Sequence, residues 1–207
     1  MDTATIRFGG AFGVVCALAM TPVLLTGTRD TSAALATANG IVPLLHILFG
    51  LAFLGVLVAM LRQAAGPAPD VYAALAGGVL FFTLTAGGFA LAVIPAAVAQ
   101  SGAPDITELN EPLLTLAMQL YSYCQIGAVA MIFATSAIVW RTAVLPKWTA
   151  VGAVLGFLPL VHTWIPLPAA VSSLGWILLI GLVMLIAPIG AQESSQPVND
   201  DAPGVRN

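Results

Sequence analysis

The sequence contains very little charge. Lys, Arg, Asp and Glu together make up 7% of its 207 residues, whereas hydrophobic residues make up 59%. A soluble globular domain carries about 25% charged residues. So few charges cannot cover the surface of a water-soluble fold, so lipid must be the solvent for most of the chain. The composition predicts an integral membrane protein with no room for a second, soluble domain.

Other scarcities exclude several functional classes. The net charge is −3 and no basic cluster is present, which argues against a nucleic-acid partner. The only cysteines, Cys16 and Cys124, lie in apolar runs without metal-ligand spacing, so they are interpreted as packing residues. P-loop, G-x-S-x-G and H-E-x-x-H motifs are absent, which argues against ordinary membrane hydrolases and metalloproteases.

Six apolar runs are each long enough to cross a membrane, which takes about 20 residues. The predicted fold is therefore all-α: a polytopic bundle of six transmembrane helices within residues 1–191. The predicted spans cover residues 8–26, 41–61, 71–99, 113–140, 148–165 and 169–189. The polar, Pro-, Asn- and Asp-containing residues 192–207 predict a disordered cytoplasmic tail. None of the predicted spans contains Asp, Glu, Lys or Arg, which argues against ion pumps and proton-coupled transporters.

Local signals predict several boundaries. Residues 28–40 are polar and are predicted to form a loop, as are residues 101–112. Within the second loop, Asn110, Glu111 and Pro112 predict a helix start, because they supply a cap, an acid at the positive dipole end and a first-turn proline. The short Pro-rich turn at residues 165–168 predicts that the last two spans form an antiparallel hairpin.

The distribution of basic residues predicts the orientation. With the N-terminus inside, five of the six basic residues face the cytoplasm: Arg7, Arg62, Arg141, Lys147 and Arg206. Only Arg29 lies outside. The positive-inside rule therefore predicts that both termini are cytoplasmic. Trp140, Trp148 and Trp164 fall near the predicted interfaces, as in an aromatic belt.

Two histidines are candidates for a shared ligand site. His46 lies in the second span and His162 in the fifth, both within roughly 8 Å of the outer interface. Two neutral imidazoles on facing helices ligate a b-type haem or a metal ion. The alternative is that each histidine is a hydrogen-bonded packing residue or a headgroup contact.

A polar stripe on the fourth span is the second candidate site. Thr115, Gln119, Ser122 and Gln125 recur at roughly helical spacing, mostly in the outer half of the membrane. Such residues either hydrogen-bond across helices or line a small outward-facing pocket for a quinone, a lipid or another amphipathic ligand.

Two small-xxx-small patterns predict close helix packing. Gly9 and Gly13 form the first pattern, and Gly152 and Gly156 form the second. The glycine faces are interpreted as packing surfaces within the bundle, with a partner protein as the alternative.

The junction between the fourth and fifth spans carries a family resemblance. It reads Arg141-Thr142-Ala143-Val144-Leu145-Pro146-Lys147-Trp148. This segment and the span layout resemble small bacterial membrane proteins of the domain-of-unknown-function family 4386, whose junction reads R-x-x-x-L-P-[RK]-W. The resemblance implies a multi-pass protein of the bacterial inner (plasma) membrane. It transfers no activity and no catalytic residue.

Three functions are compatible with the sequence. The first is a non-enzymatic accessory, regulatory or assembly subunit, which has membrane lipid and other membrane proteins as partners. The second is a haem b-binding or redox protein that uses His46 and His162. The third is a small carrier or lipid- or quinone-binding protein that uses Gln119, Ser122 and Gln125.

Overall fold

The described part of the chain is entirely helical. The computed structural model describes residues 1–20, 33–101, 107–161 and 166–187. The elements in chain order are α1 (Thr3–Ala19), α3 (Ala33–Ala65), α4 (Pro69–Ser101), α5 (Thr107–Thr142), the 3₁₀-helix η1 (Lys147–Gly156), α6 (Phe157–Leu160) and α7 (Pro166–Ile186). The prediction of an all-α fold is therefore confirmed for these residues. The predicted tail at residues 192–207 lies outside them.

Four of the described helices are long and apolar enough to cross a membrane. The crossing segments are Gly40–Ala65, Pro69–Pro95, Glu108–Thr142 and Pro168–Ile186, which correspond to the second, third, fourth and sixth predicted spans. The first and fifth predicted spans correspond to the shorter apolar segments Thr3–Ala19 and Lys147–Leu160. The architecture is thus that of a membrane protein, whereas the full count of six spans and the orientation stay predictions.

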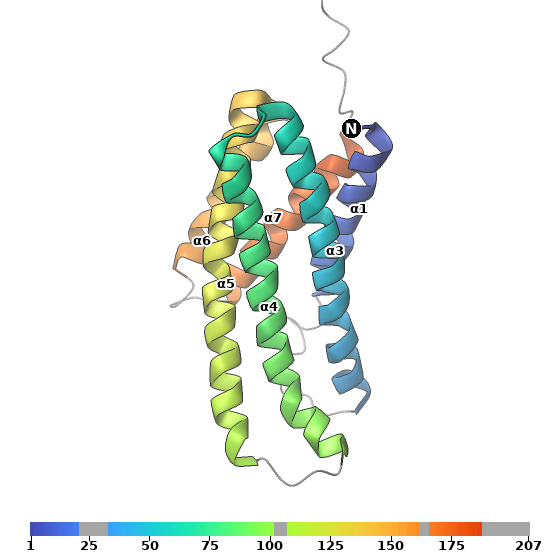
Figure 1. Cartoon of the computed structure of the whole chain (residues 1–207), viewed down its shortest axis with the longest axis vertical. Coiled ribbons are helices and arrows are strands. Elements are labelled where there is room, and N and C mark those ends of the chain that lie inside the picture. Colours follow the sequence, from blue (N-terminus) through green and yellow to red (C-terminus); the bar gives the residue numbers. More distant parts are fainter. Residues whose placement is uncertain (21–32, 102–106, 162–165, 188–207) are drawn as a thin grey trace, which may run out of the picture.

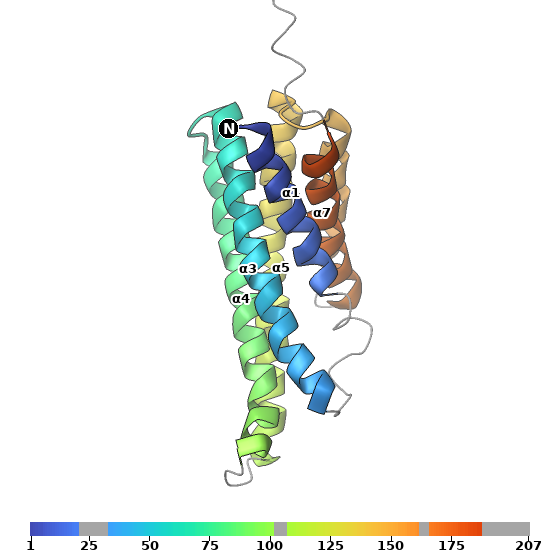
Figure 2. The ribbon, with the colours of Figure 1, turned by 90° about the vertical axis from the view of Figure 1, so that its right-hand side faces the viewer.

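The helices form an elongated bundle. α4 and α5 pack along each other over most of their length, and α1 packs between α3 and α7 (Figures 1 and 2). η1 and α6 contact both α5 and α7, as expected for the predicted hairpin of the last two spans. The N-terminus lies at the same end of the bundle as the end of α7 (Figure 1). At the opposite end, α3, α4 and α5 extend beyond α1 and α7 (Figure 2).

Glycine allows backbones to touch where the helices cross. A Cβ atom at Gly181 of α7 would lie 2.9 Å from the carbonyl oxygen of Gly10 in α1. A Cβ atom at Gly77 of α4 would lie 2.7 Å from the carbonyl oxygen of Gly127 in α5. Backbone atoms cannot move aside as a flexible side chain can, so both crossings require glycine.

The two small-xxx-small patterns are packing faces within the chain. Gly9 faces Val56 of α3, and Gly13 faces Phe53 of α3 and the backbone of α7. Gly152 faces Trp176 and Leu179, whereas Gly156 faces Ile132 and Phe133. The interpretation of both glycine pairs as packing surfaces within the bundle is therefore confirmed.

Three predicted boundaries were wrong. Residues 33–40, predicted as loop, belong to α3, because four alanines and a leucine give this segment a high helix propensity. α5 begins at Thr107, so the predicted start at Asn110 is three residues too late. α7 begins at Pro166, within the predicted turn, since a proline in the first helical turn lacks only an N–H that would have no partner there.

The fifth predicted span is a 3₁₀-helix followed by a single α-helical turn. η1 has 10 residues, far more than the usual three or four. In an α-helix the N–H of residue 159 would bond the carbonyl of Leu155, but Pro159 has no N–H. That carbonyl accepts a hydrogen bond from the Ser172 hydroxyl of α7 instead, at 2.9 Å. The bond therefore joins the end of η1 to α7 at a carbonyl that cannot receive an α-helical hydrogen bond.

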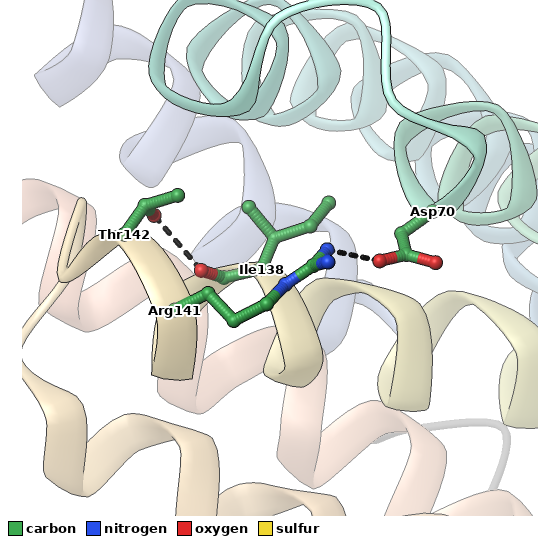
Figure 3. Close-up of polar contacts among 4 residues, drawn as sticks. All are labelled: Asp70, Ile138, Arg141 and Thr142. Carbon is green, nitrogen blue, oxygen red and sulfur yellow. Dashed lines mark hydrogen bonds and ion pairs between the residues drawn. The ribbon is translucent and has the colours of Figure 1, made fainter.

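One ion pair joins α4 and α5 at the end of the bundle that holds the N-terminus. Asp70 in the first turn of α4 pairs with Arg141 in the last turn of α5 (Figure 3). Next to it, the Thr142 hydroxyl bonds the carbonyl of Ile138 at 2.8 Å, and the chain then turns at Ala143, whose φ is 54°. Both side chains of the pair are well exposed, so the pair contributes at most about 1 kcal/mol.

Candidate functional site

His46 connects α3 to the end of α1. Its Nδ1 atom lies 2.8 Å from the carbonyl oxygen of Cys16 and 3.3 Å from the Sγ atom of the same residue. A carbonyl oxygen only accepts hydrogen bonds, so Nδ1 carries the hydrogen and donates it. Cys16 lies in the last turn of α1, where carbonyls lose their helical partners, and the N–H of Met20 bonds the carbonyl of Ala17. The imidazole therefore satisfies a backbone carbonyl that the end of α1 leaves free.

The His46 ring is closely surrounded by aromatic side chains. Its centroid lies 5.7 Å from that of Phe82 and 6.4 Å from that of Phe81, and only 1% of the residue is exposed. Phe81 and Phe82 also contact each other edge to face, with centroids 5.1 Å apart. The imidazole is thus a packed core group at the junction of α1, α3 and α4.

Gln125 forms a second interhelical contact. Its Oε1 atom accepts a hydrogen bond from the Ser173 hydroxyl of α7 at 2.8 Å, and its Nε2 atom lies 3.4 Å from the Sγ atom of Cys124. Cys124 in turn donates to the carbonyl of Tyr121 at 3.1 Å. Gln125 and Ser173 are both buried, so this bond joins α5 to α7 away from solvent.

The predicted polar stripe does not form one wall. Thr115 and Gln119 are exposed, Ser122 is half-buried, and only Gln125 lies in the core. Thr115, Gln119 and Ser122 lie along one side of α5, and the next residue on that side is Ile126. Gln125 precedes Ile126 by one residue, so its side chain points about 100° away from it around the helix. The structure therefore separates Gln125 from the other members of the stripe, which lie on the outer face of the bundle.

The predicted pair of histidines stays a prediction. His46 is described, whereas His162 lies outside the described residues. Among the residues that the structure describes, no group of three or more His, Cys, Asp or Glu side chains is arranged to hold a metal ion. His46 is instead brought together with Cys16, a contact that sequence spacing did not indicate.

Cys16 and Ser173 are the partners that sequence reasoning missed. The shorter contact with Cys16 uses the backbone carbonyl, which every residue has, so the identity of the side chain carries no signal for it. Ser173 had a signal, because two adjacent serines, Ser172 and Ser173, interrupt an otherwise apolar span. Intramembrane hydroxyl groups of this kind usually bond another helix.

A few buried polar atoms in the described residues lack a hydrogen-bond partner: Asn110 Oδ1, Thr135 Oγ1 and Trp176 Nε1. Thr135 and Trp176 are fully buried in α5 and α7. An unpaired hydroxyl or indole N–H in an apolar core is destabilising. At Thr135 and Trp176, the packing of the side chain therefore offsets the cost of a polar atom without a hydrogen bond.

Comparison of the chain with protein-family models, with the curated proteins and with the solved structures finds no match in any of the three. The resemblance of residues 141–148 to the domain-of-unknown-function family 4386 therefore stays a prediction.

Proposed function

We propose that this chain is a non-enzymatic accessory or assembly subunit of the bacterial inner membrane, with six transmembrane helices and both termini in the cytoplasm. It binds other membrane proteins through its outer surface, and membrane lipid contacts the rest of that surface. The orientation rests on the positive-inside rule. It agrees with the position of the N-terminus, the end of α5 and the end of α7 at one end of the bundle (Figure 1).

The observation that carries this proposal is that the candidate site residues inside the bundle bond the chain to itself. His46 donates to the Cys16 carbonyl, and Gln125 accepts from Ser173. A catalytic or transport site needs polar groups that converge on a place a ligand can reach. Here the groups are used to hold helices together, which is a structural function.

The haem alternative is less well supported. An axial histidine needs an open approach to its free nitrogen, wide enough for a flat macrocycle. The His46 ring is 1% exposed and packs against Phe81 and Phe82. Haem ligation would therefore require a rearrangement of α3 and α4. We expect the visible absorption spectrum of the purified protein to be unchanged by His46→Asn.

The ligand-pocket alternative is also less well supported. It requires Gln119, Ser122 and Gln125 to face one cavity, but Gln119 is exposed on the outside of the bundle and Gln125 is buried. The polar atoms of Gln125 are used by Ser173 and by the Sγ atom of Cys124. The polar groups therefore do not line a common space in the described residues.

Complementation of a deletion strain tests the proposed function. His46→Asn keeps a donor near the position of Nδ1 but removes the imidazole, and Ser173→Ala removes the hydroxyl that bonds Gln125. If the chain is a structural subunit, the ability of each variant to complement follows the abundance of folded protein in the membrane. The same strains are compared for the amounts of their other membrane complexes, at least one of which should fall in the deletion.

Two results would overturn the proposal. One is a variant at wild-type abundance that fails to complement, because this is the behaviour of a catalytic or ligand-binding residue. The other is a deletion strain in which every membrane complex is unchanged.

A further inference from the structure

The outer face of α5 carries an unpartnered seam with coiled-coil spacing. Its members recur at alternating intervals of three and four residues: Leu109, Pro112, Leu116, Gln119, Tyr123 and Ile126. These are the a and d positions of two and a half heptads. All six are exposed, and Leu109, Leu116, Tyr123 and Ile126 are each 50–55% exposed.

The seam is distinct from the faces that α5 uses inside the bundle. Gly127 and Met131 contact α4 at its crossing with Gly77. Gln125 bonds α7, and Phe133 packs edge to face against Phe157 of α6, with ring centroids 5.4 Å apart. The seam ends at Ile126, about two turns before Phe133, where α5 contacts α6. Within the described residues, no element packs on it.

Lipid alone does not explain this seam. In the proposed orientation, α5 enters the membrane at Trp140, and a hydrocarbon core of about 30 Å ends about 20 residues away, near Leu120. Leu109 and Leu116 then lie beyond the hydrocarbon, among headgroups and water. Two exposed leucines there, one heptad apart and in line with Tyr123, are typical of a surface that another helix covers.

We propose that the seam of α5 is a dimer interface and that its occupant is the same seam of a second copy of this chain. Gln119 identifies the occupant. It is the only amide of the seam, and an amide that faced an apolar helix would lose its hydrogen bonds. All copies of a membrane protein insert with the same orientation, so two α5 helices related by a two-fold axis run parallel and in register. Gln119 then meets Gln119 of the second copy.

The amide pair is self-complementary. Each carboxamide has an oxygen that accepts and an NH₂ group that donates, so two of them bond without any other group. A single polar residue in an otherwise apolar seam also fixes the register and the number of strands of a coiled coil. A two-fold interface of this kind needs only one patch, which the chain already carries.

The charges near the seam agree with a symmetric dimer. Glu108 lies at a g position, which in a parallel pair faces an e position of the other helix, and the nearest e residue is Leu113. Glu111 lies at a c position, away from the contact. No carboxylate therefore faces another carboxylate across the two-fold axis.

The inference rests on the proposed orientation but not on the proposed role as an accessory subunit, because a monomer and a dimer can both serve that role. Disulfide trapping in native membranes tests it. Cys16 and Cys124 are buried, so the background is low. Leu116→Cys places a thiol on the seam, and Leu114→Cys places one on the same helix, about 160° away around it. Oxidation with copper phenanthroline should give a covalent homodimer with Leu116→Cys, at least fivefold more than with Leu114→Cys.

A charge substitution tests the amide pair separately. Gln119→Glu keeps the size of the side chain but places two like charges next to each other in the dimer. The dissociation constant of the dimer, measured by energy transfer in vesicles, should therefore rise at least tenfold. Thr115→Glu adds the same charge at a g position and should change the constant less than threefold.

Three results would overturn the proposal. They are equal crosslinking of Leu116→Cys and Leu114→Cys, a chain that stays monomeric at every protein-to-lipid ratio, and equal effects of Gln119→Glu and Thr115→Glu. Crosslinking of Leu116→Cys to a different protein, without homodimer, would also reject a second copy as the occupant.

Discussion

Two buried threonines differ in a single hydrogen bond, and this difference predicts opposite effects of one substitution. The Thr135 hydroxyl has no partner, whereas that of Thr149 donates to the carbonyl of Pro146 at 2.8 Å. Valine has nearly the same shape as threonine. Thr135→Val should therefore raise the free energy of unfolding by about 1 kcal/mol, and Thr149→Val should lower it by about 1 kcal/mol. Reversible unfolding in mixed micelles measures both. Equal signs for the two variants would contradict the assignment of partners.

The contact between Gln125 and Ser173 allows a direct measurement of an interhelical hydrogen bond. We expect a double-mutant cycle with Gln125→Leu and Ser173→Ala to give a coupling energy of about 0.6 kcal/mol, the average between membrane helices, and no more than about 1.7 kcal/mol, the maximum found. Gln119→Leu combined with Ser173→Ala is the control, because Gln119 is exposed on another face. A coupling energy near zero for the first pair would show that the two side chains do not interact.

The sequence indicates which side chains of the site are unusual but not which of them meet. Gln125 and His46 are recognisable because polar residues inside apolar spans are rare. Their partners are 48 and 30 residues away along the chain. Which helices are neighbours depends on packing, and the Cys16 contact is made by a backbone carbonyl that every residue has. The predicted stripe on α5 is not a single site, because Gln125 points about 100° around the helix from the side that carries Thr115 and Gln119.

At the scale of the elements, the helix crossings depend on glycine. Gly181→Leu should separate α1 from α7, because its Cβ would lie 2.9 Å from a backbone oxygen of Gly10. We expect the free energy of unfolding to fall by about 1–3 kcal/mol, the usual cost of overpacking. Gly175→Leu on the same helix is the control, since a Cβ there meets nothing within 4 Å. Similar losses for both variants would indicate an effect of helix propensity or span hydropathy instead of the crossing.

The start of α1 gives a prediction for pH. The Asp2 carboxylate caps the helix by accepting from the N–H of Thr5 at 3.0 Å, and hydrogen bonds from the Thr5 side chain and backbone hold the pKa of Asp2 below its usual value of 3.8. A lowered pKa means that the cap stabilises the helix at neutral pH. This stabilisation is lost as the pH falls from about 3.8 through the lower pKa of the folded state. Amide exchange at Thr5, corrected for intrinsic rates, should therefore accelerate in acid. Asn caps the helix without titrating, so in Asp2→Asn the corrected exchange rate at Thr5 should not depend on pH.

The elements themselves were easier to predict than their ends. A run of about 20 apolar residues marks a span because the hydrocarbon core has a fixed thickness. Nothing comparable marks the end of a helix that continues past the membrane, so α3 begins well before the predicted Ile41 and α5 before Asn110. The 3₁₀ geometry of η1 was also not predictable, because nothing in its apolar sequence distinguishes a 3₁₀-helix from an α-helix.

At the scale of the whole molecule, the helices are of unequal length. α5 has 36 residues and α4 has 33, so they are about 54 and 50 Å long, whereas α1 has 17 residues and is about 25 Å long. Fitting α5 within a hydrocarbon core of about 30 Å would need a tilt of about 56°, beyond the observed range of about 0–40°. The long helices must therefore project from one side of the membrane, as their extension past α1 and α7 indicates (Figure 2).

Labelling of single cysteines shows on which side of the membrane the long helices project. In the proposed orientation, Leu109→Cys near the start of α5 lies outside, Ala64→Cys near the end of α3 lies in the cytoplasm, and Leu80→Cys lies near the middle of the hydrocarbon. All three positions are exposed on the bundle, so only the membrane distinguishes them. In spheroplasts, a membrane-impermeant maleimide should label Leu109→Cys at once, Ala64→Cys only after permeabilisation, and Leu80→Cys in neither case. The reverse order for the first two would invert the topology. If Leu109→Cys were not labelled even after permeabilisation, the long ends of α4 and α5 would lie in lipid. Covering the leucines of the α5 seam would then remove no contact with water, and the hydrophobic effect would not favour the dimer.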